Sequence, residues 1–197
     1  VFFLARILGA LYFINNIDDK DLVARSRRSL IGNSVLFLVF FLSFVIRTLL
    51  ADGYAVNPET GEIFMEPYKY LTNFIEMPVV LVLFLIGVAL VLFGIGKSLL
   101  KPKFDKGIWF TGIGTVLAVL ALLLVAGYNH TAYYPSTNDL QSSLTLANSC
   151  SSEFTLRVMF YVSFLVPFVL AYIFYAWRSI DIHKISEKEM KDGGHAY

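Results

Sequence analysis

Charged side chains are rare within the apolar stretches of this chain, so the few that occur there are the first candidates for chemistry. Arg6 lies in the opening apolar run, and Arg157 lies near the start of the last one. Either guanidinium could contact a quinone or a lipid headgroup, although Arg6 could also snorkel to the membrane surface and Arg157 could pair with Glu153. Glu76 and Asp52 stand at the ends of apolar runs and are candidates for a proton path.

Both carboxylates also have a structural interpretation, which stays open. Glu76 precedes Pro78, where an apolar run begins, and the dipole of a helix favours an acid at its start. Asp52 follows Arg47 closely in the sequence, so these two side chains could form a local ion pair.

Histidine and cysteine offer little to a haem or a metal ion. His130, His183 and His195 all lie outside the long apolar runs, so the chain alone cannot hold a membrane haem between two histidines. Spacings typical of metal sites, such as HxxxH, ExxH and CxxC, do not occur in the sequence. We therefore expect no metal site, no bound cofactor and no catalytic residue in this chain. Cys150 is the single cysteine, which excludes an internal disulfide.

The composition places the chain in a membrane. Of its 197 residues, 57% are apolar and only 16% are charged, whereas a soluble domain carries about a quarter charged residues. The formal net charge is +1, and the basic residues gather near the ends of apolar runs. This distribution gives no indication of a nucleic-acid partner.

The apolar runs predict an all-α, polytopic membrane protein, because a spanning helix needs about 20 mostly apolar residues. Four segments meet this length: Ile31 to Leu50, Pro78 to Leu100, Ile108 to Tyr128 and Phe154 to Trp177. The opening run, Val1 to Ile14, is shorter and is interpreted as the remainder of a truncated preceding helix. The expected organisation is this helix end with a cytoplasmic loop (1–30), a four-helix transmembrane bundle (31–178) and a cytoplasmic tail (179–197).

The loops alternate between basic and non-basic, which predicts their sides of the membrane. The end of the run Pro78 to Leu100 and the loop that follows it hold four lysines (Lys97, Lys101, Lys103 and Lys106), whereas the stretch 129–153 holds no Lys or Arg. The tail after Trp177 is basic again, so the carboxy terminus is expected in the cytoplasm.

Local signals refine this picture. A short interfacial helix is expected around Tyr68 to Ile75, and Pro78 should stand in the first turn of the next span. Pro167 lies within the last span and should kink it. Ser151, Ser152 or Thr155 could cap the start of that span, and the hydroxyl-rich run before it could satisfy its own backbone in a compact loop.

Several motifs resemble subunit II of the cytochrome bd-type quinol oxidases. The strongest is PSTNDLQSSLTLANSCSSEFTLRVM followed by FYVSFLVPFVLAYIFYAW, and the shorter pieces are GALYFINN, ADGYAV and YLTNFIEMP. The resemblance covers essentially the whole chain and corresponds to the carboxy-terminal half of the usual subunit.

The resemblance implies a non-haem subunit of two four-helix bundles in a bacterial cytoplasmic (inner) membrane. Its partner would be the homologous subunit I, which carries the b-type and d-type haems and oxidises quinol. The complex implied by this resemblance would reduce oxygen to water and generate a proton gradient. Membrane lipids, a structural quinone in some members and a small single-helix subunit are further implied partners.

One alternative from another functional class stays open at this stage. Secondary transporters with inverted repeats also place broken helices in the membrane, and Pro167 and Gly94 are candidate breaks. The long apolar runs contain almost no polar groups for a substrate, which favours the oxidase subunit over half of a transporter.

Overall fold

A computed structural model describes residues 1–180 and 185–186 of the chain. It confirms the all-α, polytopic membrane class. Within these residues, four helical stretches are long and apolar enough to cross a membrane. They are α2 (Lys20–Leu50), α4 (Pro78–Leu100), α5 (Gly107–Gly127) and the stretch Glu153–Ser179, which comprises α6 (Glu153–Ser163) and most of α7 (Val166–Ile180).

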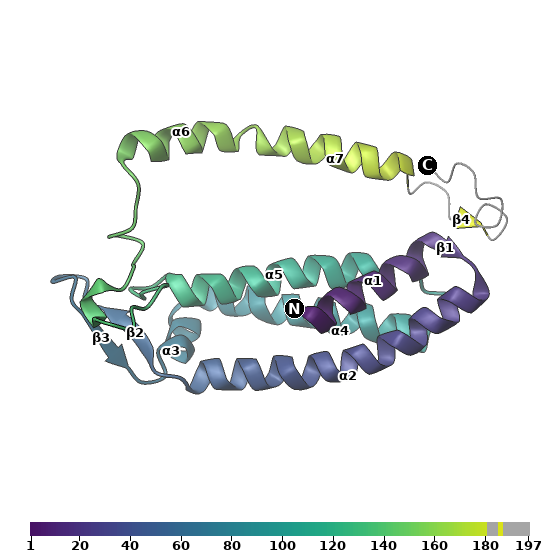
Figure 1. Ribbon diagram of the computed structural model, residues 1–197, viewed down its shortest axis with the longest axis horizontal. Helices are drawn as coiled ribbons and strands as arrows, with labels where there is room; N and C mark the ends of the chain where they lie inside the picture. The colour runs from purple at the N-terminus through teal and green to yellow at the C-terminus, as the bar shows by residue number, and fades with distance from the viewer. Residues whose placement is uncertain (181–184, 187–197) are drawn as a thin grey trace.

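The chain opens with α1 (Phe2–Asn16), which turns through β1 (Ile17–Asp18) into α2 and packs along it (Figure 1). The helix α2 begins well before the predicted Ile31, because Asp19 caps it. The Asp19 carboxylate accepts hydrogen bonds from the backbone N–H groups of Asp21 and Leu22 at 2.8 and 2.9 Å. Much of the expected loop before residue 31 is therefore helix.

Small residues bring α4 and α5 into close contact. A Cβ atom added at Gly87 would lie 2.6 Å from the backbone nitrogen of Ala118, and one added at Gly114 would lie 2.5 Å from the carbonyl oxygen of Gly87. Backbones can approach this closely only where side chains are small, a common way for membrane helices to pack. The core beside this seam contains two buried apolar clusters, one around Leu11 and one around Phe84.

The last membrane stretch is broken, as Pro167 predicts. Between α6 and α7, the N–H groups of Phe164 and Leu165 bond to carbonyls three residues earlier, at 3.2 and 2.9 Å. Pro167 has no N–H group to continue the α-helical pattern from Ser163. The kink is therefore confirmed.

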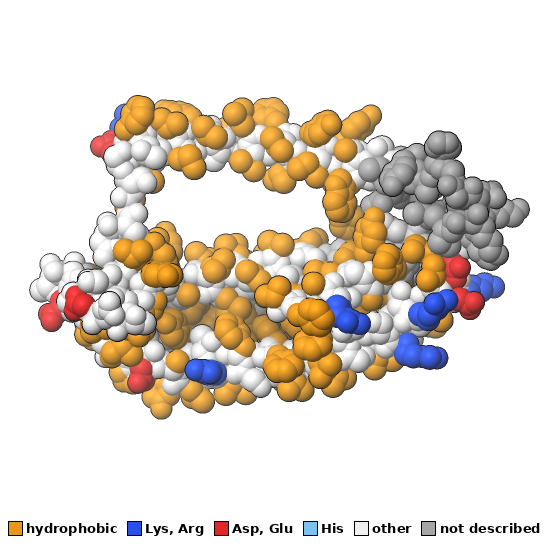
Figure 2. Space-filling model, viewed as in Figure 1, with side chains coloured by type: hydrophobic (Ala, Val, Ile, Leu, Met, Phe, Trp, Pro, Cys, Tyr) orange, Lys and Arg blue, Asp and Glu red, His pale blue; other side chains and the backbone are white. Residues whose placement is uncertain are grey.

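The tightly packed helices are α1, α2, α4 and α5, and the last stretch stands apart from them (Figure 1). None of its most apolar window is buried. Figure 2 shows apolar side chains along its length and over the neighbouring helices. In a membrane, lipid or another polypeptide has to cover such surfaces.

One end of the molecule carries a small cap, which we define as residues 51–77 and 128–152. It contains the antiparallel hairpin of β2 (Gly53–Val56) and β3 (Ile63–Glu66), the helix α3 (Lys69–Glu76) and the 3-10 turn η1 (Leu140–Ser142). The hairpin was not predicted, whereas α3 and Pro78 in the first turn of α4 are confirmed. At the opposite end, β1 pairs in parallel with β4 (Ile185–Ser186).

The hydroxyl-rich run folds as the compact loop that its composition predicts. The Ser143 hydroxyl accepts from the backbone N–H of Ser136 at 3.0 Å and donates to the carbonyl of Leu140 at 2.7 Å. The Asn148 amide exchanges bonds with its own loop, accepting from the Thr145 N–H at 2.8 Å. At the start of α6, the Ser152 hydroxyl accepts from the Thr155 N–H, so the predicted cap is confirmed.

Candidate functional site

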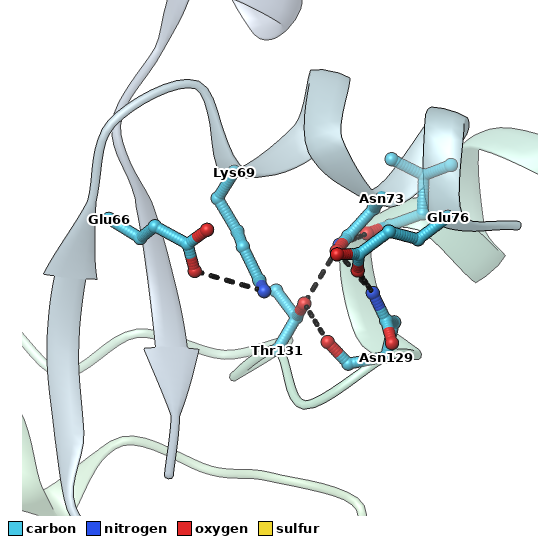
Figure 3. A network of polar contacts seen from close by, with 7 residues as sticks. Glu66, Lys69, Asn73, Glu76, Asn129 and Thr131 are labelled. Atoms are coloured by element: carbon cyan, nitrogen blue, oxygen red, sulfur yellow. Dashed lines mark hydrogen bonds and ion pairs between the residues drawn. The ribbon is translucent and has the colours of Figure 1, made fainter.

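The candidate site is a polar network within the cap (Figure 3). The helix α3 contributes Lys69, Asn73 and Glu76, whose spacing of four and three residues places them on one face. The residues that follow α5 contribute Asn129 and Thr131 from the other side. We call these five residues, together with Glu66, the cap network.

Asn73 is the centre of the cap network and is fully buried. Its amide nitrogen donates to the carbonyl oxygen of Val125 and to the Thr131 hydroxyl, both at 2.8 Å, and its oxygen accepts from the Asn129 amide at 3.0 Å. The Val125 carbonyl belongs to the last turn of α5, where carbonyls lack partners within the helix. Asn73, a residue of α3, therefore caps the carboxy-terminal end of α5.

The chain leaves α5 through a strained segment. Asn129 and His130 have φ angles of 56° and 52°, a left-handed conformation that is uncommon for residues other than glycine. The backbone of His130 is then held by β2, since its carbonyl accepts from the Val56 N–H at 2.8 Å. This conformation turns the Asn129 amide towards α3, where it donates to both Asn73 and Glu76.

Glu76 is the exposed end of the network. Its carboxylate accepts from the Asn129 amide, and the side chain is open to solvent. Through Asn129 and Asn73, this carboxylate is linked to the buried end of α5. Of the two carboxylates proposed for a proton path, Glu76 is therefore the one that the structure places in a polar network.

Lys69 is the buried, charged member of the cap network. Its side chain is 8% exposed, and its ammonium lies 3.0 Å from the carboxylate of Glu66, which is 31% exposed. A buried ammonium requires such a partner, because losing its water is costly. The lysine stem packs on Gly53, where an added Cβ atom would lie 2.5 Å from the Cβ atom of Lys69. The β2–β3 hairpin and α3 therefore pack closely against each other around the Lys69–Glu66 ion pair.

One further titratable group lies on α3. Burial raises the pKa of Tyr70 above its ordinary value, and the neighbouring Tyr54 adds to the rise. Tyr70 belongs to the same contact, since a Cβ atom added at Gly53 would lie 3.3 Å from its ring.

The structure does not bring the other predicted residues into the network. Arg6 is exposed on α1 and lies over the ring of Phe2 at 5.7 Å. Arg157 pairs with Glu153 at 2.5 Å, which was one of its predicted contacts. Asp52 is exposed between α2 and β2 and shares no hydrogen bond with the cap network.

Sequence reasoning missed every residue of the cap network except Glu76: Glu66, Lys69, Asn73, Asn129 and Thr131. A signal was present in KYLTNFIE, where polar residues recur with helical spacing on one side of a short helix. The partners after α5 lie more than fifty positions away, and no local pattern identifies them. In the part of the chain that the structure describes, His, Cys, Asp and Glu residues do not gather into a group that could hold a metal ion.

The fold and the site together define a helical integral membrane protein whose spans are apolar and whose polar chemistry lies at the cap. Comparison with known proteins gives the family. Residues 1–180 match the family of cytochrome bd terminal oxidase subunit II, and the chain belongs to that family.

Curated relatives agree with this assignment. The chain is 30% identical over 136 residues to cytochrome bd-I ubiquinol oxidase subunit 2 of Escherichia coli strain K12, and equally to the proteins of that name from the O6:H1 and O157:H7 strains. The match covers 68% of this chain and 34% of each relative. The chain therefore spans about a third of the length of the curated relatives that it matches. The family resemblance seen in the sequence motifs is confirmed.

Proposed function

We propose that the chain is part of the non-haem membrane subunit of a bd-type quinol:oxygen oxidoreductase. In this proposal it supports a haem-bearing subunit I, which oxidises quinol and reduces oxygen to water while a proton gradient forms. The family match over residues 1–180 is the observation that carries the proposal. Family membership gives no comparable support to the transporter alternative.

The distribution of apolar surface is consistent with a supporting role. Phe40 and Phe44 of α2 are 60% and 53% exposed, and Phe168 and Tyr172 of α7 are 74% and 71% exposed. Aromatic side chains bury a large surface area at interfaces, so these residues are suited to packing against a neighbouring membrane subunit. The b-type and d-type haems are assigned to subunit I, because the histidines of this chain lie outside its spans.

Charge supports an orientation in a bacterial cytoplasmic membrane. At the end opposite the cap, the described segments 18–28 and 97–106 carry eight basic and four acidic residues: Lys20, Arg25, Arg27, Arg28, Lys97, Lys101, Lys103, Lys106, Asp18, Asp19, Asp21 and Asp105. We call this the basic end, and Figure 2 shows part of its charge where α2 begins. Acidic residues dominate the cap. Under the positive-inside rule the basic end and the carboxy-terminal tail face the cytoplasm.

Individual residues receive roles within this proposal. Glu76 is the surface group of a proton path, supported by its place in the cap network, and Asp52 is a second acidic group on the same face. Arg6 is a lipid or quinone contact, supported by its exposure on an apolar helix. For Arg157 the structure supports the ion pair with Glu153. Quinol, a structural quinone and a small single-helix subunit remain proposed partners of the complex.

The test is to purify the assembly through an affinity tag on this protein and to record its absorbance spectrum and subunit masses. We expect a larger membrane subunit to co-purify, with reduced-minus-oxidised bands of b-type and d-type haem. An assembly without haem bands would refute the proposal. Substrate uptake by proteoliposomes that contain this protein alone would favour the transporter instead.

A further inference from the structure

We propose that the turn between α4 and α5 binds the phosphate headgroup of an anionic membrane phospholipid, with Lys97 as the central contact. This site lies at the basic end, far from the cap network, and does not depend on the oxidase role. Three observations carry the proposal: a turn folded around Arg27, an ammonium held between two aromatic rings, and an excess of positive charge.

Arg27 of α2 organises the turn. Its guanidinium donates to the carbonyl of Ser98, and to that of Pro102 at 2.6 Å. Longer bonds of 3.5 Å reach the carbonyls of Lys101 and Phe104. Carbonyls at the end of α4 lack partners within the helix, and one guanidinium satisfies several of them. The backbone from Ser98 to Phe104 is thereby folded around the Arg27 guanidinium.

Lys97 is held in place by two aromatic rings. Its ammonium lies 4.8 Å from the ring centre of Phe93 and 4.6 Å from that of Phe104. Cation–π contacts of this kind fix the direction of a flexible lysine while leaving its N–H groups able to donate. Among the described residues, the ion pairs are Lys69–Glu66 and Arg157–Glu153, and both lie at the cap end. Lys97 is therefore oriented without a carboxylate partner.

The turn carries a clear positive excess. Residues 97–106 contain four lysines and one carboxylate, so the formal charge of this segment is 4 − 1 = +3. Lys101, Lys103 and Lys106 are exposed. Basic residues close to a membrane surface attract anionic lipid, each by a factor of about five.

The surroundings favour a lipid over a small soluble anion. Phe93 is 45% exposed and Leu100 is 84% exposed, and both belong to the same apolar helix as Lys97. A ligand whose phosphate meets Lys97 can lay its acyl chains along these side chains. A free phosphate would use only the charged part of this surface.

The experiment uses the purified, delipidated assembly that contains the whole chain. Phosphatidylglycerol or phosphatidylcholine is titrated in detergent, and bound lipid is counted by native mass spectrometry. We expect preferential retention of phosphatidylglycerol and an affinity about fivefold lower for Lys97→Gln. Phe104→Leu keeps the charge but loosens Lys97, so it should also weaken retention. Arg47→Gln, which removes an exposed charge near the cap end of α2, is the matched control and should bind as the unaltered protein does.

Three outcomes would overturn the proposal. They are equal retention of the two lipids, unchanged retention in Lys97→Gln, and displacement of phosphatidylglycerol by millimolar inorganic phosphate, which would indicate a small-anion site. If Lys97→Gln fails to assemble, the double variant Lys101→Gln/Lys103→Gln decides the question, because both side chains are exposed and neither supports the fold. Retention equal to that of the unaltered protein in this variant would also reject the proposal.

Discussion

The side-chain amide of Asn73 donates a hydrogen bond to the carbonyl oxygen of Val125 at 2.8 Å, and this bond joins α3 to the last turn of α5. The same nitrogen donates to Thr131, so one buried side chain joins α3, the last turn of α5 and the segment that follows α5. Buried donors and acceptors that lose their partners cost about 1–3 kcal/mol each. The cap network therefore depends strongly on this residue.

We accordingly predict that Asn73→Leu lowers the stability of the cap by about 2–4 kcal/mol, since the Val125 carbonyl and the Thr131 hydroxyl both lose a donor. The measurement is the melting temperature of the purified assembly, together with proteolysis of the cap. Asn138→Leu is the control, because Asn138 is exposed in the same cap. Similar melting temperatures for the two variants would show that the network carries little of the stability.

The second prediction concerns the seam between α4 and α5. A Cβ atom at Gly94 would lie 2.8 Å from the carbonyl of Gly107 and 2.9 Å from the backbone nitrogen of Thr111, whereas one at Gly96 would meet nothing within 4 Å. Gly94→Ala should therefore destabilise the protein by about 1–3 kcal/mol, as overpacking of a tight contact does. Gly96→Ala should be neutral or slightly stabilising, because alanine favours the helix. Thermal melts of both variants test the contrast, and equal effects would argue against close packing at this seam.

The buried ion pair leads to an asymmetric prediction. Glu66→Gln leaves the ammonium of Lys69 buried without a charged partner, whereas Lys69→Met removes that charge and leaves a carboxylate that water can still reach. We expect Glu66→Gln to be the more harmful change, though below the roughly 3–5 kcal/mol of a fully buried pair, because Glu66 is partly exposed. Melting temperatures of the two variants provide the test. A larger loss in Lys69→Met would mean that the packing of the lysine stem outweighs the charge.

Alkaline pH should weaken the cap through Tyr70. Burial raises the pKa of Tyr70 in the folded protein, while the unfolded chain keeps a value of about 10. The unfolded state therefore loses this proton first, so the contribution of Tyr70 is complete below about pH 10 and declines as pH rises towards the folded pKa. Tyr70→Phe should flatten the alkaline loss of thermal stability, and Tyr134→Phe, at an exposed position in the cap, should not. Parallel pH profiles for all three proteins would contradict this assignment.

The sequence predicted the features that depend on local patterns. Apolar length identified the membrane stretches, Pro167 identified the break before α7, and the candidate capping residues Ser151, Ser152 and Thr155 indicated the start of α6, where Ser152 is the cap. The early start of α2 was missed although Asp19 is a good capping residue, because the following basic residues resembled a loop. Local patterns also could not show which helices pack together. In the structure α1 packs with α2, α4 and α5, whereas the stretch Glu153–Ser179 stands apart from them.

The cap network illustrates the same limit more sharply. Glu76 was a candidate because acids near membrane spans are often functional, yet its partner Asn129 lies 53 positions along the chain. Sequence periodicity describes one helix at a time, whereas this site joins α3 to the end of α5. The strands β2 and β3 were not predicted, because four residues are too few to show a clear alternation of apolar and polar side chains.

The last prediction separates the two interpretations of Glu76. If its carboxylate is the surface group of a proton path, Glu76→Gln should slow quinol-driven proton release by at least about tenfold in reconstituted vesicles, since transfer by a positioned group typically contributes two or more orders of magnitude. The glutamine keeps a side-chain oxygen that can accept from Asn129, so the melting temperature should change little. Glu59→Gln, on the exposed turn of the hairpin, is the charge-matched control. Normal proton release in Glu76→Gln, with or without a lower melting temperature, would leave this residue with a structural role only.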